Sequence, residues 1–357
     1  MEGVSLRLSS ENDELSILSL FSSAYGKEKR SDVWRWEYLD GSVEPIVVLA
    51  ETQGNLVGHY GILRRNLRHS GSEIRAGLVV DVMTDPRYGR RGIFVQSAEY
   101  AFSRCRDAGL SILIGFPNDA AIRGHLKVRW RELGSIGVLV RPLRVESILK
   151  RILSNERLVR YIAGALNGLL DVTLHTGRIF HDKNSVFSVI TASELLGHTD
   201  ELVEMINDSI PPHSVATERT IQWLRWRLSD PVGQHMVIAA RDRDTLRLEG
   251  ISIIKIKEIE GFKTGEILDL LVRHGHRRLE REMLFESVKL AHSHDCEMCI
   301  ILNNPAARRF LNCLSALFVP TSISLRFIVR STEGKQLPSD LLVLGNWYLD
   351  LIDHDVF

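Results

Sequence analysis

Residues 81–94 of the chain read Asp81-Val82-Met83-Thr84-Asp85-Pro86-Arg87-Tyr88-Gly89-Arg90-Arg91-Gly92-Ile93-Phe94. The apolar run that ends before Asp85 predicts a buried strand, and residues 92–108 have helical spacing. A tight turn of glycine and arginine between a strand and a helix brings several backbone N–H groups together, and the helix dipole adds positive potential there. The stretch therefore predicts an anion-binding turn. The alternative is an ordinary strand–helix turn with solvated arginines.

Residues 1–145, which include this stretch, alternate between strand and helix patterns. Strand patterns occupy residues 4–8, 45–51, 56–68, 73–84, 111–116 and 136–141, and helical patterns occupy residues 12–24, 31–39, 92–108 and 120–129. The order is β, α, α, β, β, β, α, β, α, β, which predicts an α/β fold built on a mixed sheet.

The second half of the chain repeats three landmarks of the first. Residues 34–38 are echoed by residues 224–228, residues 80–83 by 268–271, and residues 115–118 by 301–304, at offsets of 190, 188 and 186. Matches in the same order at nearly one offset indicate a duplicated domain. We therefore predict three parts: a first domain over residues 1–145, a helical connector over 146–184, and a second copy of the fold over 185–357.

The connector contains a basic amphipathic pattern around residues 148–162, in which leucine and isoleucine alternate with lysine and arginine at helical spacing. Such a helix can lie on a membrane surface. A connecting helix packed on both domains explains the pattern as well, and it is the interpretation that we favour.

Composition limits the class of protein. The 357 residues are 44% apolar, and 45 basic residues balance 45 acidic ones, so we expect a folded protein that does not bind nucleic acid in bulk. The four cysteines do not form a disulfide scaffold, and the pattern around Cys296 and Cys299 does not favour a metal site. No signal-peptide pattern or run of about 18 apolar residues is present, which predicts a cytoplasmic protein.

The turn after the strand resembles the acetyl-CoA pyrophosphate loop of the GNAT N-acetyltransferase superfamily, whose usual form is Pro-x-Tyr-Arg-Gly-x-Gly followed by Ile or Leu. Pro86, Tyr88, Gly92 and Ile93 match it, whereas Gly89 stands where the family usually has Arg or Gln. A second family motif follows the next strand: Asn118, Ala121, Lys127 and Trp130 fit its frame, whereas His125 takes the place of its Tyr and Arg129 that of its Gly.

The resemblance covers residues 1–145 well and 185–357 weakly, and it implies tandem GNAT folds that use acetyl-CoA and no metal. The cofactor-binding residues that it implies, together with the arginines that add charge for phosphates, are Val82, Met83, Thr84, Arg87, Gly89, Arg90, Arg91, Gly92, Ile93 and Asn118. A backbone N–H around residues 82–84 would stabilise the oxyanion.

Three side chains are candidates for proton transfer. His125 stands where the family has the tyrosine that acts as acid, and its imidazole can titrate near neutral pH. Asp81 is a charged residue in an apolar strand, so it either faces the acceptor or forms a structural ion pair; its echo Asp269 favours the ion pair. His59 lies on a neighbouring strand and has no counterpart in the second copy.

In the second copy, the alignment places Glu280 opposite Gly92, and a carboxylate there would repel pyrophosphate. We therefore expect one cofactor site, with a degenerate second copy that closes the acceptor cleft or makes a homo-oligomer contact. The expected activity is transfer of acetyl from acetyl-CoA to a primary amine of a small molecule, such as an amino sugar or sugar nucleotide, in a ternary complex. The alternatives are an inactive acyl-CoA sensor, an interaction scaffold, a longer acyl donor and acylation at a membrane surface.

Overall fold

A computed structural model describes residues 3–41, 43–176 and 184–354 of the chain. The strands of the first half are β1 (Ser5–Leu8), β2 (Ile46–Thr52), β3 (Asn55–His69), β4 (Ser72–Thr84), β5 (Ile112–Gly115) and β6 (Arg131–Pro142). Its helices are α1 (Glu14–Tyr25), α2 (Ser31–Tyr38), α3 (Ile93–Asp107) and α4 (Ile122–Lys127), with short 3-10 turns η1 (Glu11–Asp13) and η2 (Pro86–Tyr88). All ten predicted elements are present in the predicted order, so the mixed α/β fold is confirmed.

The second half repeats this arrangement. Its strands are β7 (Ser185–Ile190), β8 (Val215–Thr217), β9 (Gln234–Asp242), β10 (Leu248–Ile259), β11 (Phe262–Val272), β12 (Met298–Leu302), β13 (Val319–Ser331) and β14 (Trp347–Tyr348). Its helices are α7 (Ala192–Gly197), α8 (Thr199–Ser209), α9 (Ile221–Leu228), α10 (Arg277–Ser293) and α11 (Phe310–Ser315), and η4 (Ser339–Leu342), η5 (Leu344–Asn346) and η6 (Leu351–Asp353) follow β13. The three sequence echoes fall on equivalent parts of the two halves: α2 with α9, β4 with β11, and the end of β5 with the end of β12.

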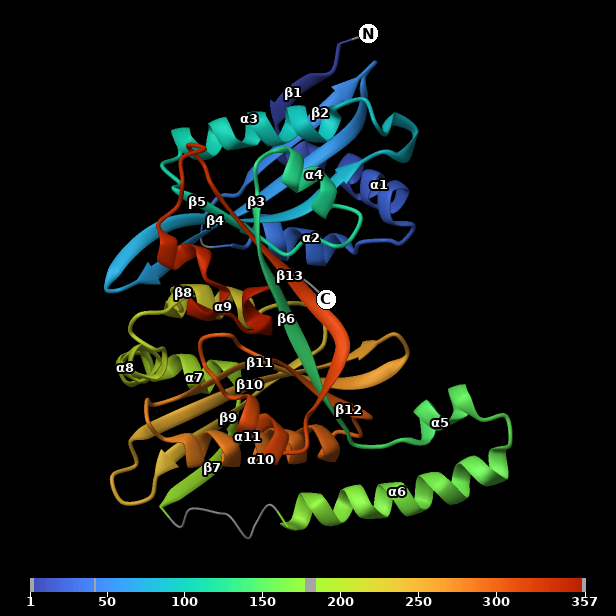
Figure 1. Cartoon of the computed structure of the whole chain (residues 1–357), viewed down its shortest axis with the longest axis vertical. Helices are drawn as coiled ribbons and strands as arrows, with labels where there is room; N and C mark the ends of the chain where they lie inside the picture. Colours follow the sequence, from blue (N-terminus) through green and yellow to red (C-terminus); the bar gives the residue numbers. More distant parts are fainter. Residues whose placement is uncertain (1–2, 42, 177–183, 355–357) are drawn as a thin grey trace.

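The two halves share one sheet because they exchange a strand. The strand order is β1-β2-β3-β4-β5-β13-β6-β12-β11-β10-β9-β7. β13 from the second half pairs with β5, and β6 from the first half pairs with β12, while β6 and β13 run antiparallel down the middle of the molecule (Figure 1). Since the sheet has no break between the halves, the predicted boundaries after residues 145 and 184 stay a prediction.

Helices cover both faces of the first half of the sheet. α3 and α4 lie on one face, where the buried side chains include Tyr60, Phe102 and Trp130. α1 and α2 lie on the opposite face, in a larger apolar cluster that continues into the second half through α9. The turn that joins β4 to α3 therefore lies at the carboxyl end of an inner strand of the sheet. Helices cover both faces of the sheet there.

Residues 146–176 form two helices, α5 (Glu146–Ile152) and α6 (Glu156–Thr176). Only one end of α6 lies near α10 in Figure 1, where the carboxylate of Asp171 is 3.1 Å from His292 Nε2. The opposite side of α6 faces solvent, since Tyr161 is 81% exposed. Among the described residues, no helix is long and apolar enough to cross a bilayer.

The equivalent helices α2 and α9 meet through a reciprocal tryptophan pair. Trp36 Nε1 donates to the carbonyl oxygen of Trp226 at 2.8 Å, and Trp226 Nε1 donates to that of Trp36 at 2.7 Å. The two rings stack with their centroids 5.3 Å apart. The two residues are related by the 190-residue offset, so the contact joins the same position of both copies inside the core.

We predict that Trp36→Phe lowers the free energy of unfolding by about 1–3 kcal/mol more than Trp34→Phe. Trp36→Phe leaves the buried carbonyl of Trp226 without its donor. Trp34 is the matched control, because it is equally buried on the same helix and its Nε1 has no hydrogen-bond partner among the described residues. Urea unfolding of both variants gives the difference, and equal losses would contradict an energetic role for the reciprocal pair.

Candidate functional site

The β4 strand carries a bulge at the position where it separates from β5. β4 and β5 pair in parallel as far as Val79 and Gly115. On the other side of β4, the register with β3 shifts between His59 and Gly61, which leaves Asp81 and Val82 without a partner residue. Asp81 has a φ of 46°, a left-handed conformation that costs a non-glycine residue free energy. The bulge therefore gives residues 81–82 a conformation different from the rest of the strand, next to the opening between β4 and β5.

The turn after β4 is held by Asp85. This carboxylate accepts from the backbone N–H of Arg87 at 2.9 Å and pairs with its guanidinium at 2.7 Å. The guanidinium also holds the pKa of the Asp85 carboxyl below its usual range, since a hydrogen bond to the charged form favours ionisation. Arg87 is thus bound to Asp85, which reduces the charge that it can offer to a phosphate, although its side chain is largely exposed.

The end of the turn forms a left-handed entry into α3. Arg90 has a φ of 62°, and Gly92, the N-cap of α3, has a φ of 79°. A Cβ added to Gly92 would have only the tip of Gln96 nearby, at 3.6 Å, so space is open in front of the helix. The first turn of α3 presents N–H groups that have no acceptor within the helix. Arg90 and Arg91 are exposed and form no ion pair among the described residues, so this end of α3 carries uncompensated positive charge.

A charged cluster lies beside the bulge, on the face that α1 and α2 cover. The ammonium group of Lys29 forms ion pairs with both Glu37 and Asp81, and the Tyr38 hydroxyl donates to Asp81 at 2.8 Å. The Lys29 ammonium also lies over the rings of Phe21 and Tyr38, 5.3 and 5.5 Å from their centroids. The two carboxylates raise the pKa of Lys29 against the opposing effect of burial. Asp81 is therefore a member of a structural ion pair, the second of its two predicted roles.

His59 is part of the same cluster. Its Nδ1–H donates to the backbone carbonyl of Asp81 at 2.7 Å, and its ring packs edge-on against Tyr38. Nε2 is buried and has no hydrogen-bond partner in the described part of the chain. Burial lowers the pKa of this imidazole, so the ring is neutral near pH 7 and Nε2 carries a lone pair. His59 can therefore accept a proton next to the bulge.

His125 lies on the opposite face of the sheet. Its ring sits among Tyr60, Phe94 and Trp130, with centroid separations of 5.2–6.3 Å. Its Nδ1 is buried without a described hydrogen-bond partner, and burial lowers the pKa of the imidazole to about 4. His125 therefore does not join His59 and Asp81, and at neutral pH its ring is neutral.

Asn118 shapes the turn into α4. Its Oδ1 accepts from the backbone N–H groups of Ala120 and Ala121 at 3.1 and 2.9 Å. The carbonyl side of this amide is therefore occupied by the turn, which leaves the Nδ2 group for a ligand.

The second half repeats the ion pair at the bulge. β11 also has a register shift beside the echoed aspartate, which leaves Leu268 without a partner residue next to Asp269, and Arg219 binds Asp269 at 2.6 Å. Arg219 and Asp269 are both 0% exposed, whereas Asp81 in the first half is 14% exposed. Arg219 stands at the 190-residue offset from Lys29, a signal that was present in the sequence and could have identified Lys29 as the partner of Asp81.

The structure corrects the alignment of Glu280 with Gly92. The N-cap of α10 is His276, so His276 is the counterpart of Gly92, and Glu280 lies one turn inside the helix. Four residues separate β11 from α10, whereas eight separate β4 from α3. The sequence does not show that this loop is shorter in the second half. Extending the offset of the strands through the loop therefore placed the start of the second helix at the wrong residue. The Glu280 carboxylate is bound by Arg309 at 3.4 Å and by Asn312.

Comparisons with known proteins agree with this architecture. Residues 5–126 match the family model of the acetyltransferase (GNAT) domain. No curated protein matches the chain in sequence. A tandem GNAT protein from the clavulanic acid biosynthesis pathway has a similar fold, with a TM-score of 0.60 at 10% identity over 94% of this chain and 100% of that chain.

Two further structures have the same fold at low identity. N-myristoyltransferase of Saccharomyces cerevisiae with bound myristoyl-CoA gives a TM-score of 0.62 at 8% identity, over 92% of this chain and 79% of that chain. A glucosamine N-acetyltransferase region of a fungal multi-domain β-N-acetylglucosaminidase gives 0.61 at 14% identity, over 92% of this chain and 38% of that chain.

The family match identifies residues 5–126 as an acyltransferase domain, a class whose members take acyl groups from acyl-CoA donors. Residues 5–126 match the GNAT acetyltransferase domain, and the chain as a whole has the fold of a tandem GNAT protein.

The burial of His125 predicts a pH dependence of stability. The pKa of His125 is about 4 in the folded chain, against 6.5 for an unperturbed imidazole. Between these values the unfolded chain binds a proton that the folded chain excludes, so the free energy of unfolding falls as pH falls from about 6.5 to 4. About 2 kcal/mol of this loss develops between pH 7 and 5. Urea unfolding at the two pH values should show a shallower pH dependence for His125→Phe than for the wild type.

His198→Phe is the control, because His198 is exposed and water surrounds its imidazole in both states. It should keep the wild-type pH dependence. An unchanged dependence in His125→Phe would show that other groups cause the loss.

Proposed function

We propose that the first half binds acetyl-CoA at the β4–α3 turn and transfers the acetyl group to a primary amine of a small molecule. The observation that carries the proposal is the combination of the bulge at Asp81–Val82 with the left-handed, cationic entry into α3. The bulge provides a place for the thioester, and the turn provides a place for the diphosphate. Both lie at the end of β4.

The donor would be held mainly by the main chain. The N–H groups of the turn and of the first turn of α3, around Gly89, Gly92 and Ile93, would surround the diphosphate. Arg90 and Arg91 would add positive charge, and Arg87 would keep the turn in shape through Asp85. Backbone groups of Val82, Met83 and Thr84 would face the thioester, and Asn118 Nδ2 would lie across the opening on the β5 side.

The transfer follows from the chemistry of a thioester. The lone pair of the neutral amine attacks the carbonyl carbon, so a C–N bond forms while the C–S bond breaks. Negative charge develops on the carbonyl oxygen, and a backbone N–H around Val82–Thr84 would stabilise it. The amine loses one proton, and the leaving thiolate of CoA takes one up. A base on the acceptor side and an acid on the donor side would serve these two proton transfers.

His59 is our candidate for the base. Its Nδ1–H is already committed to the Asp81 carbonyl, so the tautomer leaves Nε2 free to accept a proton. Asp81 would then be a positioning residue. Its backbone carbonyl orients His59, and its side chain is bound by Lys29 and Tyr38. His125, on the α3 side of the sheet, is the candidate for the group on the donor side: as a neutral imidazole it would donate a hydrogen bond to the leaving sulfur, and the thiolate would take its proton from solvent.

The acceptor class is inferred from a protein with a similar fold. One of the proteins with the same fold is a glucosamine N-acetyltransferase region, so amino sugars and sugar nucleotides are the first acceptors to test. Another binds myristoyl-CoA, so longer acyl donors belong in the same assay. Binding of a donor without release of CoA in the presence of varied amines would instead support an acyl-CoA sensor, and no binding at all would support an interaction scaffold.

We predict that Gly92→Glu lowers the affinity for acetyl-CoA by about 100-fold or more. A carboxylate at the N-cap of α3 would lie within a few ångströms of the diphosphate, and two like charges about 4 Å apart repel by about 4 kcal/mol at an effective dielectric constant of 20. Isothermal titration of the full-length protein gives the affinity.

Gly71→Glu is the control for this substitution. Gly71 lies in the exposed β3–β4 turn with the same φ of 79°, so the variant carries the same charge and the same backbone strain away from the site. It should bind acetyl-CoA as the wild type does. Equal affinity of the two variants would remove the β4–α3 turn as the donor site.

We predict that His59→Gln lowers kcat by about 100-fold or more with an acceptor that is turned over, while the affinity for acetyl-CoA changes little. Glutamine retains a polar group but cannot accept the proton. His125→Phe should lower kcat less strongly if the acid only assists departure of the thiolate, which is the better leaving group. A normal kcat in His59→Gln would assign the base to another residue.

A further inference from the structure

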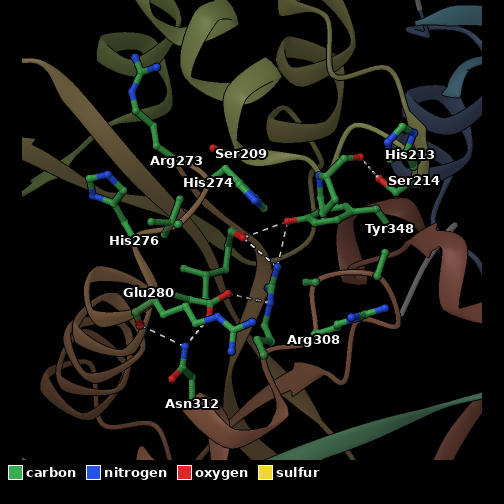
Figure 2. Close-up of a pocket in the computed structure, with 18 of the residues that line it drawn as sticks. Ser209, His213, Ser214, Arg273, His274, His276, Glu280, Arg308, Asn312 and Tyr348 are labelled. Atoms are coloured by element: carbon green, nitrogen blue, oxygen red, sulfur yellow. Dashed lines mark hydrogen bonds and ion pairs between the residues drawn. The ribbon is translucent and has the colours of Figure 1, made fainter. Parts of the chain in front are cut away.

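The second half contains a pocket of about 390 Å³ at the end of β11 (Figure 2). The β11–α10 loop, the start of α10, the segment after β12, the segment that precedes β14 and residues 209–214 surround it. Pockets of about 300–1,000 Å³ are the usual size for small-molecule ligands. This pocket occupies the place that corresponds, by the repeat, to the donor site of the first half.

The floor of the pocket is built from a buried arginine. Arg309 is almost fully buried, and its guanidinium donates to the carbonyl oxygen of Leu270 at 3.0 Å and to the Tyr348 hydroxyl at 2.9 Å. It also pairs with Asp350 at 3.4 Å. These contacts join β11 to the C-terminal segment, so the floor is preorganised.

The pocket is cationic in balance. Among the described residues that line it, Glu280 is the only carboxylate; Asn312 binds it, and it shares the guanidinium of Arg309 with Asp350. Arg273 is also compensated, since Glu204 and Asp208 pair with it from outside the pocket at 3.2 and 3.1 Å. These pairs leave Arg277 and Arg308 as the arginines of the lining whose charge is not compensated.

Two arginines and two histidines remain around the opening. Arg277 and Arg308 are exposed and form no ion pair among the described residues, and His213 and His274 line the same space. Figure 2 shows the His274 ring directed toward the middle of the pocket. Arg308 has a φ of 52°, so the chain holds this side chain at the rim in a strained conformation. The uncompensated charge is positive and comes from groups that bind phosphate oxygens well.

The pocket differs from an acyl-donor site in its loop. The turn that leads into α10 is half as long as its counterpart before α3, and a histidine takes the place of the N-cap glycine. The shorter turn keeps one left-handed glycine, Gly275, but offers fewer backbone N–H groups than the turn before α3. We therefore expect side chains at the rim, rather than backbone N–H groups, to bind the ligand, and such side chains can reach a terminal phosphate.

We propose that this pocket binds a small molecule that carries a phosphate monoester or a diphosphate group, at a site separate from the acyl-donor site of the first half. Arg308, Arg277 and His274 would contact the phosphate oxygens. The floor beneath the rest of the ligand would be formed by Arg309, Tyr348 and Glu280.

The test uses inorganic pyrophosphate and the full-length Gly92→Glu protein, in which the first-half turn is blocked. Isothermal titration should show one site in this protein. Adding Arg308→Gly should weaken binding at least tenfold. Glycine adopts the left-handed conformation without strain, so this substitution should not lower the melting temperature.

Arg129→Gly is the matched control. Arg129 is also an exposed arginine with a φ of 64° and no described ion pair, but it lies in the first half after α4. In the Gly92→Glu background it should leave pyrophosphate binding unchanged. Arg277→Ala gives a second test at the start of α10 and should also weaken binding.

Four results would overturn the proposal. The first is no pyrophosphate binding by Gly92→Glu, and the second is equal binding by Arg308→Gly and Arg129→Gly. The third is equal affinity for malonate, which would make the pocket a general anion site. Binding of acetyl-CoA to Gly92→Glu that Arg308→Gly abolishes would identify a second donor site and would likewise overturn it. Failure of wild-type protein to bind acetyl-CoA affects only the proposed function of the first half.

Discussion

The pairing of β13 with β5 and β6 holds this molecule together. Each half lacks the strand that would complete its own sheet beyond β5 or β12 and obtains it from the other half through backbone hydrogen bonds. Buried N–H and C=O groups must find partners, so neither half can leave this arrangement without exposing or orphaning a row of them. The exchange also brings the two halves close enough to share the core around Trp36 and Trp226.

On this common scaffold the two halves have diverged at equivalent positions. Both have a bulge beside a buried pair of a cation and a carboxylate, Lys29 with Asp81 and Arg219 with Asp269. In the first half the pair adjoins His59 and keeps some exposure, whereas in the second half Asp353 joins the pair and seals it completely. The turn before the helix is long and contains the N-cap glycine in one half and is short in the other. The scaffold is repeated, but the chemistry that it presents is not.

Local patterns predicted most of the first half. Strand and helix periodicity, the glycine of the turn and the echoes of α2 and β4 all depend on neighbours in the sequence, and the structure contains each of them. The exchange of β6 and β13 could not be predicted, because periodicity shows that a segment is a strand but not which strand it pairs with. The burial of His125 also escaped prediction, since it depends on Tyr60, Phe94 and Trp130 coming together from different elements.

The same exchange has a consequence for synthesis of the chain. Ser331 of β13 pairs with Ile112 of β5, about 220 residues earlier. At a translation rate of about 5–20 residues per second, β5 emerges from the ribosome roughly 10–45 s before its neighbour exists. During that time the apolar strand Ile112–Gly115 has an open edge, which other chains can pair with. The nascent protein therefore has to remain soluble with an unfinished sheet until β13 has been synthesised, so both halves complete their part of the sheet at the same step.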